Sequence, residues 1–587
     1  DPEDNTIREN NSYLYTDPDD PTALPETILP KGGIYNLTEY SLLSTDFRAT
    51  VAYNADLGRN GDHILSLFGG GELNSTDRQY TWFRGWGYQY NNGGTPYNDY
   101  RLFKQAQEEN TNYFSNTFSY YRNLAFFGMA TYSYKGRYTV NGTIRYEGTN
   151  KLGKSRAARW LPTWNVSAAW NAHEESWWVP TFDKWWTHAS LKASYSLTAD
   201  RGPTSVTNSL AVFESYTPFR PSTNASETGI QLSDLENSEL TYEKKHELNI
   251  GVAFGFVDNR INLEFDWYKR NNYDLIGYVQ TMGVGGQVTK LANDATMSSQ
   301  GCEFTFSTVN VKTRDFRWTT DWIFSLAENK ITKLDSRSQI YQLVSGTALG
   351  RLEGYPVGAL FSIPFAGLTE EGLPTFYIDK EHTQVVGPGQ YDQINFQDYQ
   401  NVDYLTYEGS IDPTITGSFG NTFSWKGLKL NVFFTYSFGN VLRLDPLCYV
   451  YRSEYSDLTA SMKEMKNRWE VPGDEAITTI PAIATTRQFD QISNLQDAYS
   501  AYNYSTERVA KGDFIRLKEL SLAYDLPAKV FEGQKAVSSF GVKLSATNLW
   551  LAYADKKLNG RDPEYYNAGG VSSPVPRQFT LTVKLGF

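Results

Sequence analysis

The chain has 587 residues, a formal net charge of -12 and an aromatic content of 15%. Its mean hydropathy is -0.50, and no run of about 18 apolar residues occurs, which excludes helical membrane spans. The negative charge argues against a nucleic-acid partner. With only two cysteines and five histidines, the chain has neither a disulfide framework nor a metal site built from several cysteines.

The last eleven residues, Arg577 to Phe587, alternate strictly between apolar and polar side chains. This pattern predicts a strand with one apolar and one polar face. Because the chain ends on an aromatic residue with no polar tail, we expect Phe587 to be structural. Closed sheets of such strands can cross a bilayer, since every backbone group is then paired. The segment is therefore predicted to be the closing strand of a transmembrane β-barrel.

About fifteen segments of the chain show this alternation, and each is predicted to be a strand. In chain order they are Phe47–Tyr53, Ile64–Gly71, Ala125–Tyr134, Tyr138–Tyr146, Trp164–Trp170, Leu191–Leu197, Leu248–Phe256, Ile261–Trp267, Cys302–Phe306, Phe316–Phe324, Phe419–Phe423, Leu428–Phe438, Leu520–Tyr524, Phe540–Ala546 and Phe579–Phe587.

The connections between these segments alternate between short and long. Lys135–Gly136 and Lys426–Gly427 are predicted two-residue turns, whereas residues 72–121 are predicted to be a long loop. Every short turn then lies at one end of the sheet and every long loop at the other. The predicted fold class is all-β, a transmembrane antiparallel β-barrel with the short turns and the C-terminus in the periplasm and the long loops outside.

The strand count and the beginning of the chain predict an incomplete barrel. An odd number of strands leaves an unpaired edge, and single-chain bacterial barrels use an even number. The chain opens at Asp1 without the charged and apolar signal region that export requires. We therefore expect residues 1–35 to be the remnant of an external loop, and earlier strands of the same gene product to be missing.

Several motifs, most of them in the second half of the chain, point to a known family. The most specific is Gly512–Pro527, with the sequence GDFIRLKELSLAYDLP, followed by Thr547–Leu551 and Gly560–Glu564. Supporting matches are Asp412–Phe423, Gly354–Gly358 and Leu191–Tyr195. Together they resemble the C-terminal part of the SusC/RagA-type TonB-dependent outer-membrane transporters, over nearly all of residues 36–587.

This resemblance implies a barrel of about 22 strands with an N-terminal plug, of which the chain holds the C-terminal part. It further implies a TonB-binding segment and a SusD-like surface lipoprotein as partners. The plug, the TonB-binding segment and about seven strands are expected outside this chain, and residues 36–587 are expected to be the barrel domain. The implied function is import of an oligosaccharide or oligopeptide across the outer membrane; the alternative is an adhesin or structural barrel without transport.

Aromatic residues in the predicted long loops are candidates for contact with a substrate or a lid protein. Large rings and polar side chains can bind solutes, but long loops also need aromatic residues for their own packing. The sequence leaves these two interpretations open. The candidate residues are Trp82, Arg84, Trp86, Tyr88, Tyr90, Tyr391 and Tyr399.

A second aromatic group lies in a predicted periplasmic connection. Tryptophan is enriched at both membrane–water interfaces, so an interface girdle is favoured over a sugar-stacking platform. The predicted girdle residues are Trp177, Trp178, Trp185, Trp186 and Phe587.

No motif predicts covalent chemistry or a bound cofactor. Asp392, Asp398 and Asp403 could hold calcium, but their spacing does not match a calcium-binding loop, so a solvated acidic loop is favoured. The five histidines are scattered and lie near no nucleophile motif. We therefore expect no enzymatic activity and no resident cofactor.

Overall fold

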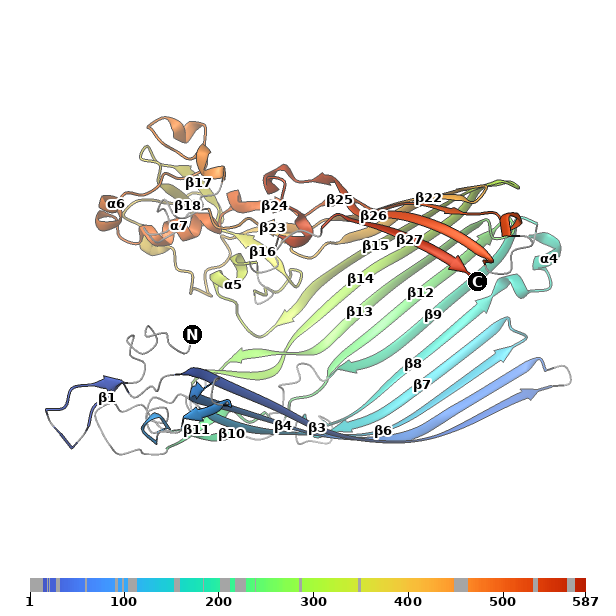
Figure 1. Ribbon diagram of the computed structural model, residues 1–587, viewed down its shortest axis with the longest axis horizontal. Coiled ribbons are helices and arrows are strands. Elements are labelled where there is room, and N and C mark those ends of the chain that lie inside the picture. Colours follow the sequence, from blue (N-terminus) through green and yellow to red (C-terminus); the bar gives the residue numbers. More distant parts are fainter. Residues whose placement is uncertain are drawn as a thin grey trace.

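The computed structural model describes residues 14–587 except 18, 21, 28–31, 59–60, 90–92, 98–99, 104–112, 153–158, 183, 201–211, 217–228, 238, 284–287, 347–349, 448–462, 532–536 and 567–575. Fifteen strands form one antiparallel sheet in sequential order. The short β5 (Thr95–Tyr97) pairs with β4, and Figure 1 shows the long strands side by side. The fifteen strands are β3 (Gly33–Leu57), β4 (His63–Gln89), β6 (Phe114–Tyr134), β7 (Tyr138–Thr149), β8 (Trp160–Asn171), β9 (Trp186–Asp200), β12 (Glu243–Phe256), β13 (Ile261–Gln280), β14 (Thr289–Lys312), β15 (Phe316–Leu334), β21 (Ile415–Trp425), β22 (Leu428–Phe438), β25 (Phe514–Asp525), β26 (Ser539–Ala554) and β27 (Gln578–Gly586).

These fifteen strands correspond one to one with the predicted segments, so the all-β prediction is confirmed. The prediction of a long loop over residues 72–121 is wrong, because β4 continues to Gln89 and β6 already begins at Phe114. Residues such as Ser75, Asp77 and Gln79 keep the backbone pairing of β4 without an apolar face. Hydrophobic alternation marks only the part of a strand that has one apolar side, so it missed these polar extensions.

The register joins the strands into two continuous faces. On one face Leu430 pairs with Leu522, Leu522 with Leu544, and Leu544 with Leu581. One residue along, on the opposite face, Asn431, Ser521, Ser545 and Thr580 form the neighbouring row. Apolar side chains thus face apolar side chains across strands, and polar side chains face polar ones. We call the two sides the apolar face and the polar face.

Short and long connections lie at opposite ends of the sheet (Figure 1). The turn at Lys426–Gly427 has two residues, both with positive φ, as a tight hairpin of this kind requires. The turn between β6 and β7 has three residues, 135–137, because Tyr134 pairs with Tyr138. That turn is one residue longer than predicted.

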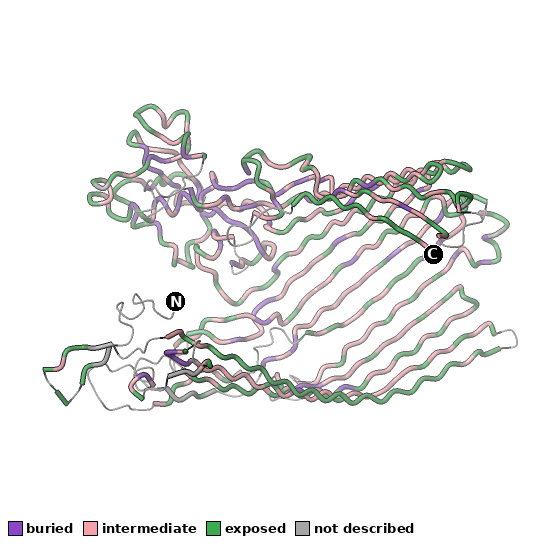
Figure 2. The backbone as a smooth tube through the Cα atoms, in the orientation of Figure 1, coloured by how far each residue is buried: buried purple, intermediate pink, exposed green. Residues whose placement is uncertain are grey.

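At the long-loop end, residues 335–414 and 439–513 fold together into a body that we call the loop unit. It has its own core, which includes Leu343, Phe376, Tyr391 and Tyr499, and Figure 2 shows buried backbone gathered there. Its elements are α5 (Ile340–Val344), β16 (Ala359–Ser362), β17 (Phe365–Leu368), β18 (Pro374–Tyr377), β19 (Val385–Val386), η3 (Tyr391–Gln393), β20 (Thr406–Ser410), β23 (Val441–Arg443), η5 (Lys463–Asn467), η6 (Asp474–Ala476), α6 (Thr486–Gln491), α7 (Leu495–Asn503), η7 (Thr506–Arg508) and β24 (Val509–Lys511).

A third segment, residues 555–566, lies against the loop unit, and we call it the brace. Its Leu558 is buried with Leu442, Leu444 and Ala510 of the loop unit. The remaining elements are β1 (Leu14–Tyr15), β2 (Glu26–Thr27), η2 (Ala172–Glu174), α4 (Trp178–Thr181), β10 (Val212–Tyr216), β11 (Gly229–Asp234), η8 (Ala528–Phe531), η9 (Lys556–Leu558) and η10 (Pro563–Tyr565). Among the described residues, no helix has the length and apolar character needed to cross a membrane.

Candidate functional site

The polar face of the first strands carries a network of opposite charges. Arg145 contacts Glu72 on β4 and lies 2.6 Å from Glu147, its neighbour two residues along β7. Arg48 on β3 lies 4.0 Å from Glu72 and packs over the ring of Phe127. Residues of this network line a cavity of about 590 Å³. Because the charges are already paired with one another, this part of the wall offers hydrogen bonds more than net charge.

Four of the residues predicted to contact a substrate or a lid protein lie on the extension of β4 and not in a loop. The register of β4 is unbroken from His63 to Gly85, which places Trp82 and Arg84 on the same polar face as Glu72. The Arg84 guanidinium lies 5.2 Å from the Trp82 ring and donates to Asn36 at 3.0 Å. These two side chains continue the wall of the sheet beyond the paired charges.

Trp86 and Tyr88 differ in their surroundings. Trp86 is 2% exposed and packs edge-on against Phe103. The prediction that this residue contacts a substrate or a lid protein is therefore wrong. Tyr88 stacks on Tyr35 of β3 with ring centroids 4.7 Å apart. Tyr90 lies outside the described residues. The ring of Trp86 is covered because neighbouring segments close over the end of β4, which the sequence does not show.

In the loop unit, Tyr391 and Tyr399 also have different environments. Tyr391 is fully buried, its hydroxyl donates to the Pro374 carbonyl at 2.9 Å, and burial raises its pKa. It is a core residue, so the expected contact with substrate or lid is wrong. Tyr399 is 38% exposed and remains available. The described residues, which include Asp392, Asp398 and Asp403, contain no group of three or more His, Cys, Asp or Glu placed to hold a metal.

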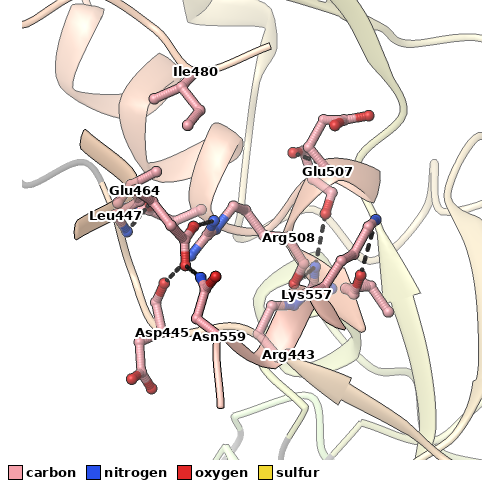
Figure 3. Close-up of polar contacts among 12 residues, drawn as sticks. Arg443, Asp445, Leu447, Glu464, Ile480, Glu507, Arg508, Lys557 and Asn559 are labelled. Carbon is pink, nitrogen blue, oxygen red and sulfur yellow. Dashed lines mark hydrogen bonds and ion pairs between the residues drawn. The ribbon is translucent and has the colours of Figure 1, made fainter. Parts of the chain in front are cut away.

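Buried arginines hold the loop unit together and fix it to the brace (Figure 3). Arg508, 3% exposed, donates to Glu464 at 2.6 Å and to the Asp445 carbonyl at 2.7 Å. Glu464 in turn accepts from Asn559 of the brace at 2.8 Å. Arg561 of the brace also pairs with the Asp445 carboxylate. Charged hydrogen bonds of this kind are directional, so they fix how the segments meet.

Arg443 is the second arginine of this cluster. Its guanidinium donates to the carbonyls of Val344, Phe361 and Ser505, at 3.2, 2.6 and 2.8 Å. Desolvation lowers the pKa of Arg443 to about 10, and the charge of Glu408 acts in the opposite direction. The side chain therefore ties three separate stretches of the loop unit to one point.

The motifs that carry the family resemblance meet in space. Arg516 of the Gly512–Pro527 motif lies 2.5 Å from Asp562 and 2.9 Å from Glu564, both from the Gly560–Glu564 motif. At Gly512 a side chain would collide with the side-chain amide of Asn440, so a larger residue would require that amide to move. Both motifs are visible in the sequence, but the contact between Arg516 and Asp562 joins positions 46 residues apart and could not be predicted from spacing alone.

These motifs surround a cavity of about 680 Å³ at the long-loop end of the sheet. Beside it, β25 carries a bulge, because the register shifts between Leu517 and Glu519 and leaves Lys518 outside the ladder. Bulges commonly redirect a side chain next to a functional site. The lining residues are Ile411, Pro413, Thr416, Gly417, Thr435, Tyr436, Ser437, Asn440, Leu442, Gly512, Phe514, Lys518, Pro563 and Glu564.

The predicted girdle tryptophans form one aromatic cluster at the short-turn end. Trp178 is 4% exposed and donates its ring N–H to the Trp186 carbonyl at 2.8 Å. Trp186 stacks on Phe256 with ring centroids 5.7 Å apart. Trp177 and Trp185 are about half exposed, and Phe587 is 89% exposed. Trp178 is therefore packed inside the cluster and Trp186 is partly covered, whereas Trp177, Trp185 and Phe587 expose their rings.

Comparison with known proteins identifies the family. The model of the family described as TonB dependent receptor-like, beta-barrel, matches residues 3–365, which is more than half of the chain. The chain therefore belongs to this family of outer-membrane β-barrels, and the resemblance inferred from the motifs is confirmed.

Individual relatives agree with this assignment. TonB-dependent receptor P26 of Formosa agariphila is 25% identical over 590 residues, which cover 95% of this chain and 55% of that protein. TonB-dependent receptor SusC of Bacteroides thetaiotaomicron is 21% identical over 79% of this chain and 43% of its own length. The chain thus spans about half the length of these curated relatives.

A solved structure of the RagAB peptide transporter superposes with a TM-score of 0.72. The alignment covers 94% of this chain and 56% of that chain at 21% identity. At this identity the match establishes the fold alone.

Proposed function

We propose that the chain forms the wall of an outer-membrane transporter that imports an oligosaccharide or oligopeptide. The observation that carries this proposal is a fifteen-strand sheet of the TonB-dependent receptor family with one continuous apolar face and one continuous polar face. A wall of this kind contacts lipid outside and a polar solute inside. The chain itself performs no covalent chemistry in this proposal.

We propose residues 36–587 as the barrel domain, although the first strand of the sheet, β3, already begins at Gly33. Among the described residues, the edge strands β3 and β27 do not pair with each other. Unpaired edges in lipid are costly, so we propose that further strands close the sheet. The long-loop end is the external mouth, with the C-terminus in the periplasm, TonB as the energy-coupling partner and a SusD-like lipoprotein above the loop unit.

At the external mouth, Trp82, Arg84, Tyr88 and Tyr399 are the proposed contacts with solute or lipoprotein. The arrangement supports this role because two of them lie on the polar face of the sheet and Tyr399 is exposed on the loop unit. At the opposite end, Trp177, Trp185 and Phe587 are the proposed interface residues.

The test is uptake by cells that express the complete transporter with its neighbouring lipoprotein. We expect import of at least one labelled pool, oligosaccharides or oligopeptides, to require both this gene and TonB. Import that is unchanged after deletion of the gene would contradict the proposal. Loss of cell attachment in place of uptake would show that the protein is an adhesin.

A further inference from the structure

A group of cations lies on the polar face at the short-turn end of the last strands. Lys429 of β22, Lys543 of β26 and Lys584 of β27 line one cavity of about 430 Å³. Hydrogen-bonding side chains lie between them. The other lining residues are Thr422, Asn431, Ser521, Ala523, Asp525, Gly541 and Val542.

The register extends this group across neighbouring strands. Lys429 pairs with Ser424, and Ser424 pairs with Arg317 of β15. Arg317 in turn pairs with Lys312 of β14. Cross-strand partners lie on the same face, so these cations share the polar face. We call Lys312, Arg317, Lys429, Lys543 and Lys584 together the cationic band.

Few carboxylates lie close enough to neutralise the positive charges of the cationic band. Lys543 lies 3.1 Å from Glu519, and Asp525 lines the same cavity. In the part of the chain that the structure describes, no ion pair is formed by Lys312, Arg317, Lys429 or Lys584. The whole chain carries a net charge of -12, so the band is a local reversal of sign. This contrasts with the first strands, where Arg145 is matched by two carboxylates.

We propose that the cationic band is an anion-binding element of the wall, which takes carboxylate or sulfate groups on the transported solute. Rows of lysine and arginine inside a pore concentrate and select anions, because low-dielectric walls strengthen their field. Thr422, Asn431 and Ser521 supply hydrogen-bonding groups beside the charges. The inference rests on the proposed function, since it places a solute on the polar face.

The group that the band would bind is an oxyanion on a flexible oligomer. Two classes of solute carry such a group. A glycan with uronic acid or sulfate groups carries it, and so does a peptide rich in glutamate or aspartate. The experiment therefore uses matched probes: tetragalacturonate with a neutral tetrasaccharide, and tetraglutamate with tetraglutamine. Binding to the complete purified transporter is measured by calorimetry at low and high salt.

The test variant is K429Q/K543Q/K584Q, which removes three charges from the cavity. Its matched control is K380Q/K466Q/K556Q, which removes three charges from exposed positions in the loop unit and brace. We expect at least one anionic probe to bind the native protein and the control, and to bind the test variant at least tenfold more weakly. High salt is expected to weaken native binding more than binding to the variant.

The anionic probe that binds identifies the source of the oxyanion. The proposal is overturned if no anionic probe binds better than its neutral partner, or if the test variant binds as the native protein does. Import by cells is measured in parallel. Import that shows no preference for anionic probes would overturn the role of the cationic band but would leave the proposed function intact. Absence of any import by the native protein would overturn the proposed function.

Discussion

The sheet and the loop unit place their apolar side chains in opposite directions. On β27 Phe579 and Leu581 are 69% and 66% exposed, whereas Leu343 and Tyr499 of the loop unit are 1% and 2% exposed (Figure 2). In the proposed outer-membrane wall, lipid covers the apolar face of the sheet and accepts its apolar side chains, whereas the loop unit lies in water and must bury its own. Whether an apolar side chain is exposed or buried therefore depends on the surrounding solvent as much as on the fold.

The two regions also differ in how they use charge. The sheet keeps Arg145 and its partners on the open polar face, part-exposed. The loop unit encloses Arg508 and Arg443 among carbonyls and a carboxylate. Charged side chains in the loop unit are thus part of its internal structure, and their removal has a different cost in each region.

The largest effect is expected from Arg508→Met in the loop unit. The substitution leaves Glu464 with only its hydrogen bond from Asn559 and removes the buried donor to the Asp445 carbonyl, so we expect a loss of about 3 kcal/mol of loop-unit stability. Hydrogen exchange of residues 463–511 measures it. The control is Arg468→Met, which breaks an exposed pair with Glu470 on the same connection and is expected to cost less than about 1 kcal/mol. Equal effects of the two substitutions would contradict the internal role of Arg508.

The next prediction tests whether the apolar face of the sheet contacts lipid and the polar face contacts water. Leu544→Arg places a charge among Leu522 and Leu581 on the apolar face, at an expected cost of about 2–4 kcal/mol near the bilayer midplane. The neighbouring Ser545→Arg points to the polar face and is expected to be much milder. Unfolding of the complete barrel in lipid vesicles measures both. Similar losses would mean that the apolar face does not contact lipid.

A smaller effect is expected at the contact between the sheet and the brace. Asp562→Asn removes one charge from the pair with buried Arg516, at an expected cost of about 1.5–3 kcal/mol. Glu564→Gln lies at the same arginine but is more exposed, so a smaller loss is expected there. Protease sensitivity of the brace orders the two variants, and the reverse order would contradict the assignment of Asp562 as the main partner.

The smallest effect is a pH dependence of the loop unit. Burial raises the pKa of Glu408 above its usual 4.5, while Ser362 and Arg443 lower it less. Folding then disfavours the charged form of Glu408, so the contribution of this group to stability is fully present below about pH 4.5 and is lost as the pH rises through the folded pKa. We expect this part of the pH profile to disappear in Glu408→Gln. Calorimetry of the complete protein between pH 4 and pH 7 follows it, and an unchanged profile would assign the effect to another group.

The candidate site shows where sequence reasoning succeeded and failed. The motifs around Arg516 and Asp562 indicated the family correctly, because they are specific strings of residues. Trp86 and Tyr391 were predicted to contact solute or lid and are buried instead. An aromatic residue in a long connection has the same appearance whether it packs or is exposed, so only the folded chain distinguishes the two.

The sequence by itself determined the fifteen strands, their two faces and the ends at which short and long connections lie. It could do so because each strand in lipid must alternate with period two, and this requirement is local. Only the tertiary structure decided that the long connections build a loop unit with its own core, that Arg508 and Glu464 meet inside it, and that Lys429 and Lys584 share a cavity. Those contacts join residues far apart in the chain, and no local pattern records which distant residues will be neighbours.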